Sequence, residues 1–144
     1  MTDVLLVGVD GSDDGKRAAE FAVERAKAGK VNLVVAYVIE WSPYTFNTPE
    51  ENEERHKRRE EEIEKAETQV LDPLVASLGS SGVKVRGIVR HGHPAKTLSE
   101  LAGETGACQI IIGRRGLSRL AALLFGSTAG TLVQISPVPV TVVP

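Results

Sequence analysis

The sequence has little cysteine, few aromatic residues, almost no net charge and no long apolar run. Cys108 is the one cysteine in 144 residues, so an internal disulfide is impossible, and we expect a reducing, cytoplasmic location. Aromatic residues make up 4% of the chain and the net charge is −2, which disfavours nucleic acid as a partner. No apolar run approaches the roughly 20 residues of a membrane helix, and no signal peptide is visible. We therefore expect no membrane partner.

The composition is otherwise that of a globular protein, with 42% hydrophobic and 25% charged residues, and it predicts a single domain over residues 1–144. Apolar runs predict five strands, at residues 4–9, 33–39, 83–90, 109–112 and 138–143. Helical spacing of apolar residues predicts four helices, around residues 18–26, 50–78, 94–105 and 127–135, and Gly29 is expected to cap the end of the first. This alternation is typical of an α/β protein with a doubly wound parallel sheet and helices on both faces. The third strand alternates in polarity and the last contains Pro139, so both favour sheet edges.

Two segments follow predicted strands and contain residues that allow close approach of a ligand. Asp10-Gly11-Ser12 follows the first strand, and Gly113-Arg114-Arg115-Gly116 follows the fourth, nine residues before Gly126-Ser127. Glycines let successive N–H groups converge on an anion, a helix N-terminus adds further donors, and arginines add charge-assisted bonds. A simpler interpretation is that the glycines mark turns and Ser127 only caps a helix. These residue types alone therefore do not decide between a phosphate site and turns followed by a helix cap.

The spacing Gly113-x2-Gly116-x9-Gly126-Ser127 resembles the G-2x-G-9x-G-S/T nucleotide motif of the ATP-binding universal stress proteins. Further segments resemble the first strand and turn of this family, the end of its second strand, the entry to its third helix and its closing strand. These segments are Val7–Ser12, Tyr37–Ile39, Gly92–Ala95 and Pro137–Val143. Together with the glycine motif they are spread, in register, over essentially the whole chain.

The resemblance implies a five-stranded parallel sheet of order 3-2-1-4-5, a Rossmann-like open sandwich, with ATP, alone or with Mg²⁺, in its crevice. It implies that Val9, Asp10, Gly11 and Ser12 meet the nucleoside and that the Val38 backbone pairs with the adenine edge. It implies that the ribose and phosphates are lined by Gly113, Arg115, Gly116, Gly126, Ser127 and Thr128. It also implies a homodimer in which the strand Val138–Val143 pairs with the same strand of a second, two-fold-related copy of the chain.

The chain departs from the family pattern in three places. Cys108 and Gln109 stand where relatives often have an acidic residue, Ala129 stands where they often have a second serine, and Leu120–Phe125 is unusually apolar. Leu120–Phe125 predicts a packed helical turn or a partner surface.

Several other residues have side chains of the kinds found in metal or catalytic sites. Asp10, Asp13 and Asp14 suit a divalent ion or, equally, turns and helix caps. His91 and His93 are predicted in a turn rather than in a metal site, and Cys108 as a small buried residue. Gly11–Arg17 departs from a Walker A loop in its glycine spacing and in Arg17, which takes the place of the magnesium-binding hydroxyl residue.

The sequence thus predicts a nucleotide-dependent regulatory protein of the stress response, without assigned catalytic residues. No Walker B strand, catalytic-base histidine or arginine finger is evident. The alternative is a slow ATPase or nucleotidyl transferase that uses the same crevice, with Asp10 and Arg115 as candidate charged residues. A phosphoacceptor receiver is excluded, because His91 and Pro144 lie near the places that require an aspartate and a lysine.

Overall fold

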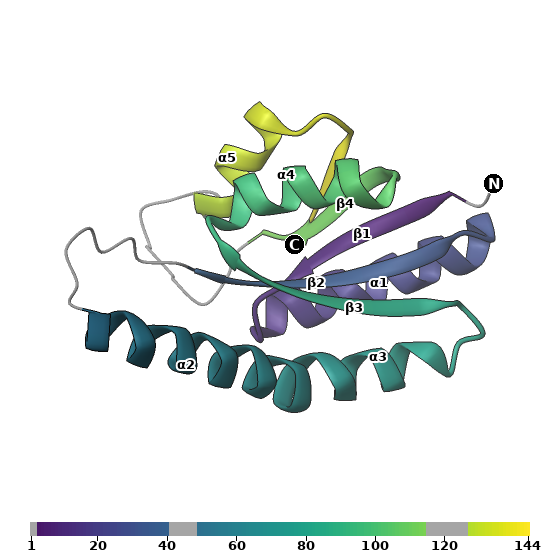
Figure 1. Ribbon diagram of the computed structural model, residues 1–144. Coiled ribbons are helices and arrows are strands. Elements are labelled where there is room, and N and C mark those ends of the chain that lie inside the picture. Colours follow the sequence, from purple (N-terminus) through teal and green to yellow (C-terminus); the bar gives the residue numbers. More distant parts are fainter. Residues whose placement is uncertain (1–2, 41–48, 115–126) are drawn as a thin grey trace.

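Five parallel strands form one sheet in the order β3-β2-β1-β4-β5 (Figure 1). The structure, a computed structural model, describes residues 3–40, 49–114 and 127–144. The strands are β1 (Val4–Val9), β2 (Asn32–Glu40), β3 (Val85–Gly92), β4 (Ala107–Gly113) and β5 (Val140–Val143). This confirms the expected α/β class and the order 3-2-1-4-5. The half-buried β3 and the short β5 lie at the two edges, as their sequences predict.

Helices cover both faces of the sheet (Figure 1). One face packs against α1 (Asp13–Gly29) and α3 (Asp72–Gly79), and the other against α4 (Pro94–Thr105) and α5 (Ser127–Ile135). Side chains alternate along β1, so Leu5, Val7 and Val9 enter the α1 core while Leu6 enters the α4 core. Within the described part of the chain, no helix has the length and apolar character that a membrane crossing requires.

The long helix predicted over residues 50–78 is one helical run with a widened turn inside it. It consists of α2 (Pro49–Ala66), the π-helical turn η1 (Glu67–Leu71) and α3. Pro73 lacks an N–H, and its ring would clash with the carbonyl of residue 69 in a regular α-helix. The π-turn just before Pro73 removes that conflict, so the helix continues without a break.

Three local predictions differ from the structure. His91 and Gly92 are the last residues of β3 rather than part of a turn, and His93 is the N-cap of α4. The left-handed residue that ends α1 is Lys30, with φ 54°, and not Gly29. Cys108 is exposed, because the β1–β4 register shifts from Val4↔Ala107 to Leu5↔Gln109 and leaves Cys108 without a partner on β1.

Candidate functional site

The order of the strands reverses at β1: β2 and β3 lie on one side of it, and β4 and β5 lie on the other. The chain leaves β1 toward α1 on one face, and it leaves β4 toward α5 on the other face (Figure 1). In open parallel sheets this divergence makes a crevice beyond the carboxyl ends of the strands, where ligands bind. The ends of β1, β2 and β4 therefore define the candidate site.

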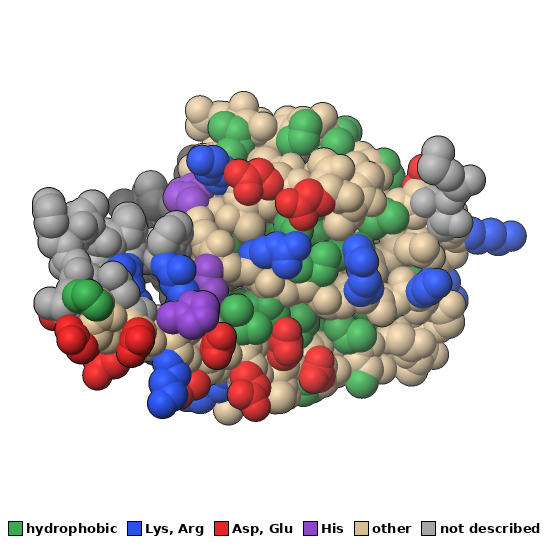
Figure 2. Space-filling view, in the orientation of Figure 1, with side chains coloured by type: hydrophobic (Ala, Val, Ile, Leu, Met, Phe, Trp, Pro, Cys, Tyr) green, Lys and Arg blue, Asp and Glu red, His purple; other side chains and the backbone are tan. Residues whose placement is uncertain are grey.

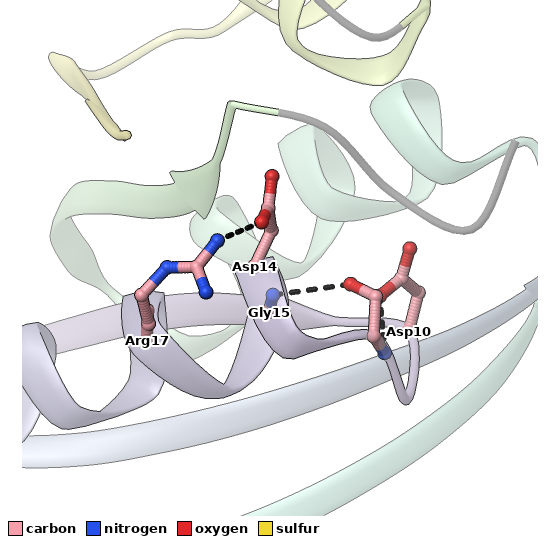
Figure 3. Close-up of polar contacts among 5 residues, drawn as sticks. Asp10, Asp14, Gly15 and Arg17 are labelled. Carbon is pink, nitrogen blue, oxygen red and sulfur yellow. Dashed lines mark hydrogen bonds and ion pairs between the residues drawn. The ribbon is translucent and has the colours of Figure 1, made fainter. Parts of the chain in front are cut away.

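The turn after β1 is held by a short chain of hydrogen bonds (Figure 3). The Ser12 N–H donates to Asp10 Oδ1 over 2.9 Å, and the Ser12 hydroxyl donates to the same oxygen. Ser12 Oγ in turn accepts from the Gly15 N–H over 3.1 Å, which makes Ser12 the N-cap of α1. Asp10 thus orients the serine that begins the helix. Asp13 and Asp14, which were weighed as caps, instead lie in the first helical turn.

Two glycines allow this turn to fold tightly. Gly11 has φ +84°, a conformation that residues with a side chain rarely adopt. A Cβ on Gly15 would lie 3.2 Å from Asp10 Oδ1 and 3.3 Å from the Asp10 nitrogen. Gly15 therefore lets the first turn of α1 come close to Asp10. Gly15 is not among the predicted site residues, although its place three residues after Ser12 marks the N–H that a capping serine bonds.

Tyr37, near the end of β2, lies beside the turn. Burial raises the pKa of the Tyr37 phenol, and the negative charge of Asp10 raises it further. A phenol whose pKa is raised in the folded state stabilises the fold below the ordinary tyrosine pKa of about 10. That contribution is lost as the pH rises through the folded-state pKa.

Replacing Asp10 by asparagine is expected to lower the pKa of Tyr37 while leaving it above about 10, because the burial remains. The amide oxygen can still accept from Ser12, so the turn should persist. The chain has two tyrosines, so the titration is followed by tyrosinate absorbance in a Tyr44→Phe background. An unchanged titration curve in Asp10→Asn would mean that the Asp10 charge does not act on Tyr37.

The end of β4 lies directly against the first turn of α1. A Cβ on Gly113 would lie 2.8 Å from the Asp14 carbonyl oxygen and 2.9 Å from its carbon. The Asp14 side chain is 10% exposed and pairs with the half-exposed Arg17 (Figure 3). The Arg114 N–H donates to the Val143 carbonyl over 2.8 Å and ties this end of β4 to β5. The proximity of Asp14 and Gly113 could not be predicted from the sequence, because only the fold brings the two residues together.

The end of β2 reaches past the end of β1. Val9 pairs with Tyr37, and β2 continues to Glu40 alongside β3. The Asn32 N–H donates to the Asp3 carbonyl, so even-numbered residues of β2 direct their backbone groups toward β1. The Val38 carbonyl and the Glu40 N–H are therefore on the β1 side, beyond the last β1 pair. They offer one acceptor and one donor at the candidate crevice.

The structure brings six of the predicted site residues to one edge of the sheet, the residues Val9, Asp10, Gly11, Ser12, Val38 and Gly113. Ser127 and Thr128 begin α5, the helix that follows the predicted phosphate segment. Arg115, Gly116, Gly126 and Leu120–Phe125 lie outside the described residues.

The histidines weighed as metal ligands have other contacts. His91 Nε2 is 3.0 Å from Glu62 of α2, and His93 Nδ1 accepts from the Lys96 N–H over 3.4 Å. Figure 2 shows histidine side chains next to the acidic side chains of α2. In residues 3–40, 49–114 and 127–144, no three His, Cys, Asp or Glu side chains converge on a possible metal position.

Comparison with known proteins finds similarity over the full length of the chain. The profile of the universal stress protein family matches residues 1–144. A universal stress protein from Thermus aquaticus is 32% identical over 144 residues, with 99% of each chain covered. Universal stress protein YxiE from Bacillus subtilis is 28% identical over 150 residues, again with 99% of each chain covered.

Solved structures show the same fold. Universal stress protein UspA from Lactobacillus plantarum has a TM-score of 0.86 at 24% identity and covers 99% of this chain and 97% of its own. A universal stress protein in complex with cAMP has a TM-score of 0.67 at 23% identity, covering 99% and 97%. One from Archaeoglobus fulgidus in complex with dAMP has a TM-score of 0.65 at 19% identity, covering 100% and 98%. The family match over every residue, the relatives and the fold lead to one conclusion: the chain belongs to the universal stress protein family.

Proposed function

We propose that this chain binds an adenine nucleotide, and specifically ATP with or without Mg²⁺, in the crevice beyond β1, β2 and β4. The observation that carries the proposal is the contact of Gly113 with the Asp14 backbone. This contact sets the first glycine of the Gly113-x2-Gly116-x9-Gly126-Ser127 segment beside the Asp10–Ser12 turn. A phosphate held by the glycine segment would then lie within reach of a nucleoside at that turn.

The end of β2 supports an adenine in particular. Adenine presents one donor and one acceptor on its outer edge, and the Val38 carbonyl and Glu40 N–H provide the complementary pair on the side of β1. The complexes of universal stress proteins with cAMP and dAMP support the same class of ligand. In this proposal Asp10, Gly11 and Ser12 contact the nucleoside, while Gly113, Arg115, Gly116, Gly126, Ser127 and Thr128 line the ribose and phosphates.

We further propose that nucleotide occupancy regulates a homodimer that acts in the stress response. Ile110 N–H donates to the Pro139 carbonyl and Arg114 N–H to the Val143 carbonyl, so residues 139 and 143 of the last segment face β4. Alternation along the strand then directs the backbone groups of Val140 and Val142 away from β4, at the outer edge of the sheet. An edge of this kind can pair with a two-fold copy of itself.

Titration calorimetry with ATP and AMP tests the proposal, after any nucleotide carried through purification has been released and identified. We expect ATP to bind, and we expect Gly126→Val to weaken binding at least tenfold, because a side chain keeps backbone N–H groups away from phosphate. Gly103→Ala is the matched control, since a Cβ at Gly103 meets nothing within 4 Å. Its affinity should equal that of the unaltered chain.

The same preparations test the assembly by sedimentation velocity with and without ATP. A dimer whose dissociation constant changes when ATP is added supports the regulatory proposal. A chain that sediments as a monomer in both conditions argues against it. If the unaltered protein carries no nucleotide and gives no heat with millimolar ATP or AMP, the crevice is not a nucleotide site.

A further inference from the structure

A groove lies between α1 and the η1–α3 segment, behind the Asp10–Ser12 turn. Its volume is about 290 Å³. Val9, Val70 and Leu74 supply aliphatic surface to it, with Val9 buried and the other two half-buried. Asp13 and Lys16 of α1 line one wall, and Gln69 of η1 lines the opposite wall. The groove thus combines an aliphatic floor with a charged rim.

This groove adjoins the proposed nucleotide crevice at the Asp10–Ser12 turn but extends from it over different residues. Val9 belongs to the core on the α1 face of the sheet, whereas Val38 belongs to the core on the α4 face. Gly113 does not line the groove, whereas Gly11 and Ser12, which are proposed above to contact the nucleoside, do, so the groove and the crevice adjoin at this turn. A volume of about 290 Å³ lies just below the range of about 300–1,000 Å³ found for drug-sized ligands. It suits a small metabolite better than a nucleotide.

The charges on the α1 wall indicate what kind of molecule fits. Asp13 and Lys16 are three residues apart on the helix, so their side chains leave the same face as neighbours. Both are exposed, and in the described segments of the chain neither forms an ion pair. One negative and one positive group, side by side above an aliphatic floor, complement a small zwitterion with an apolar body.

The opposite wall is shaped by the π-turn. η1 contains Gln69 and Val70, and the following Pro73 also lines the groove. Single π-turns inside α-helices occur frequently at functional sites, because the wider turn changes which side chains face a ligand. A Cβ added to Gly11 would lie 3.9 Å from the Val70 side chain, so the π-turn faces the Asp10–Ser12 turn across the groove.

We infer that this groove binds a free α-amino acid with an aliphatic side chain. The ligand carboxylate pairs with the Lys16 ammonium, and the ligand ammonium pairs with the Asp13 carboxylate. The aliphatic side chain packs on Val9, Val70 and Leu74, and the Gln69 amide lies opposite the charged end. This inference does not depend on nucleotide binding.

L-Leucine is the probe, titrated by calorimetry into the full chain with and without ATP. Two analogues separate the recognition of each charge: 4-methylpentanoate lacks the ammonium, and 3-methylbutylamine lacks the carboxylate. We expect leucine to bind and each analogue to bind at least tenfold more weakly, because each loses one charge-assisted contact. Equal affinity for leucine and either analogue would overturn the assignment to amino acids.

Three variants on α1 locate the site. Lys16→Met and Asp13→Asn should each weaken leucine binding about tenfold or more. Both side chains are exposed, so the loss of either charge should leave folding intact. Lys27→Met in the last turn of α1 is the matched control and should bind leucine normally. Circular dichroism checks that all three variants fold. If leucine gives no heat at millimolar concentration, or binds all three variants equally, the groove is not an amino-acid site.

Discussion

Replacing Leu6 by alanine is expected to lower the free energy of unfolding by about 2–5 kcal/mol, the range found for large-to-alanine changes in cores. Leu6 lies on the central strand β1 and is fully buried among the side chains that α4 and α5 press onto the sheet. Alanine would remove aliphatic contacts and leave a cavity, because strands on both sides of β1 prevent the core from collapsing. For a chain of this size the melting temperature should fall by roughly 5–15 °C.

Urea denaturation followed by circular dichroism measures the effect at one fixed protein concentration, so that any self-association affects each variant alike. Val133→Ala is the control, because that side chain is 57% exposed on α5. Its unfolding free energy should change by no more than about 0.5 kcal/mol. A Leu6→Ala protein as stable as the control would mean that this core is not packed as the structure shows.

Replacing Gly113 by valine is expected to weaken ATP binding at least tenfold and to lower stability by about 1–3 kcal/mol, the usual effect of overpacking. The Cβ of a new side chain would be 2.8 Å from the carbonyl oxygen of Asp14, closer than real Cβ atoms approach. The obstacle is helix backbone and not a flexible side chain. The end of β4 and the start of α1 must therefore separate, and the proposed phosphate segment moves away from the Asp10–Ser12 turn.

Calorimetry with ATP and urea denaturation are both needed, since they report the two consequences separately. Gly103→Ala, in the last turn of α4, should bind ATP normally and be at least as stable as the unaltered chain, because alanine is the better helix former. A Gly113→Val protein with unchanged ATP affinity but lower stability would restrict Gly113 to packing. Unchanged values for both quantities would contradict the contact with Asp14.

Much of the fold could be predicted from local patterns. The continuous apolar residues of Val4–Val9 indicate a strand buried on both faces, and the alternation in β3 indicates an edge. Pro94 and Gly106 mark the start and end of α4 because each favours a backbone conformation found at a helix end. Each of these signals depends only on a few consecutive residues, so it can be recognised from the sequence without knowledge of the tertiary structure.

Other features could not be predicted because they depend on pairing between distant segments. The exposure of Cys108 follows from a register shift against β1, although its neighbours suggest a buried strand. Likewise, His91 continues β3 because β2 continues alongside it as far as Glu40. Strand pairing overrides the turn signal of the local sequence there.

The sequence by itself determined the class of fold, the strand order through its family resemblance, and the edge of the sheet at which Asp10, Val38 and Gly113 belong. These follow from hydrophobic periodicity and from short motifs, which are local in the chain. Only the tertiary structure decided that Gly113 contacts Asp14, that Asp10 acts on Tyr37, and that α1 and η1 enclose a groove behind the turn. Those contacts join residues far apart in sequence, and they exist only once the helices have packed onto the sheet.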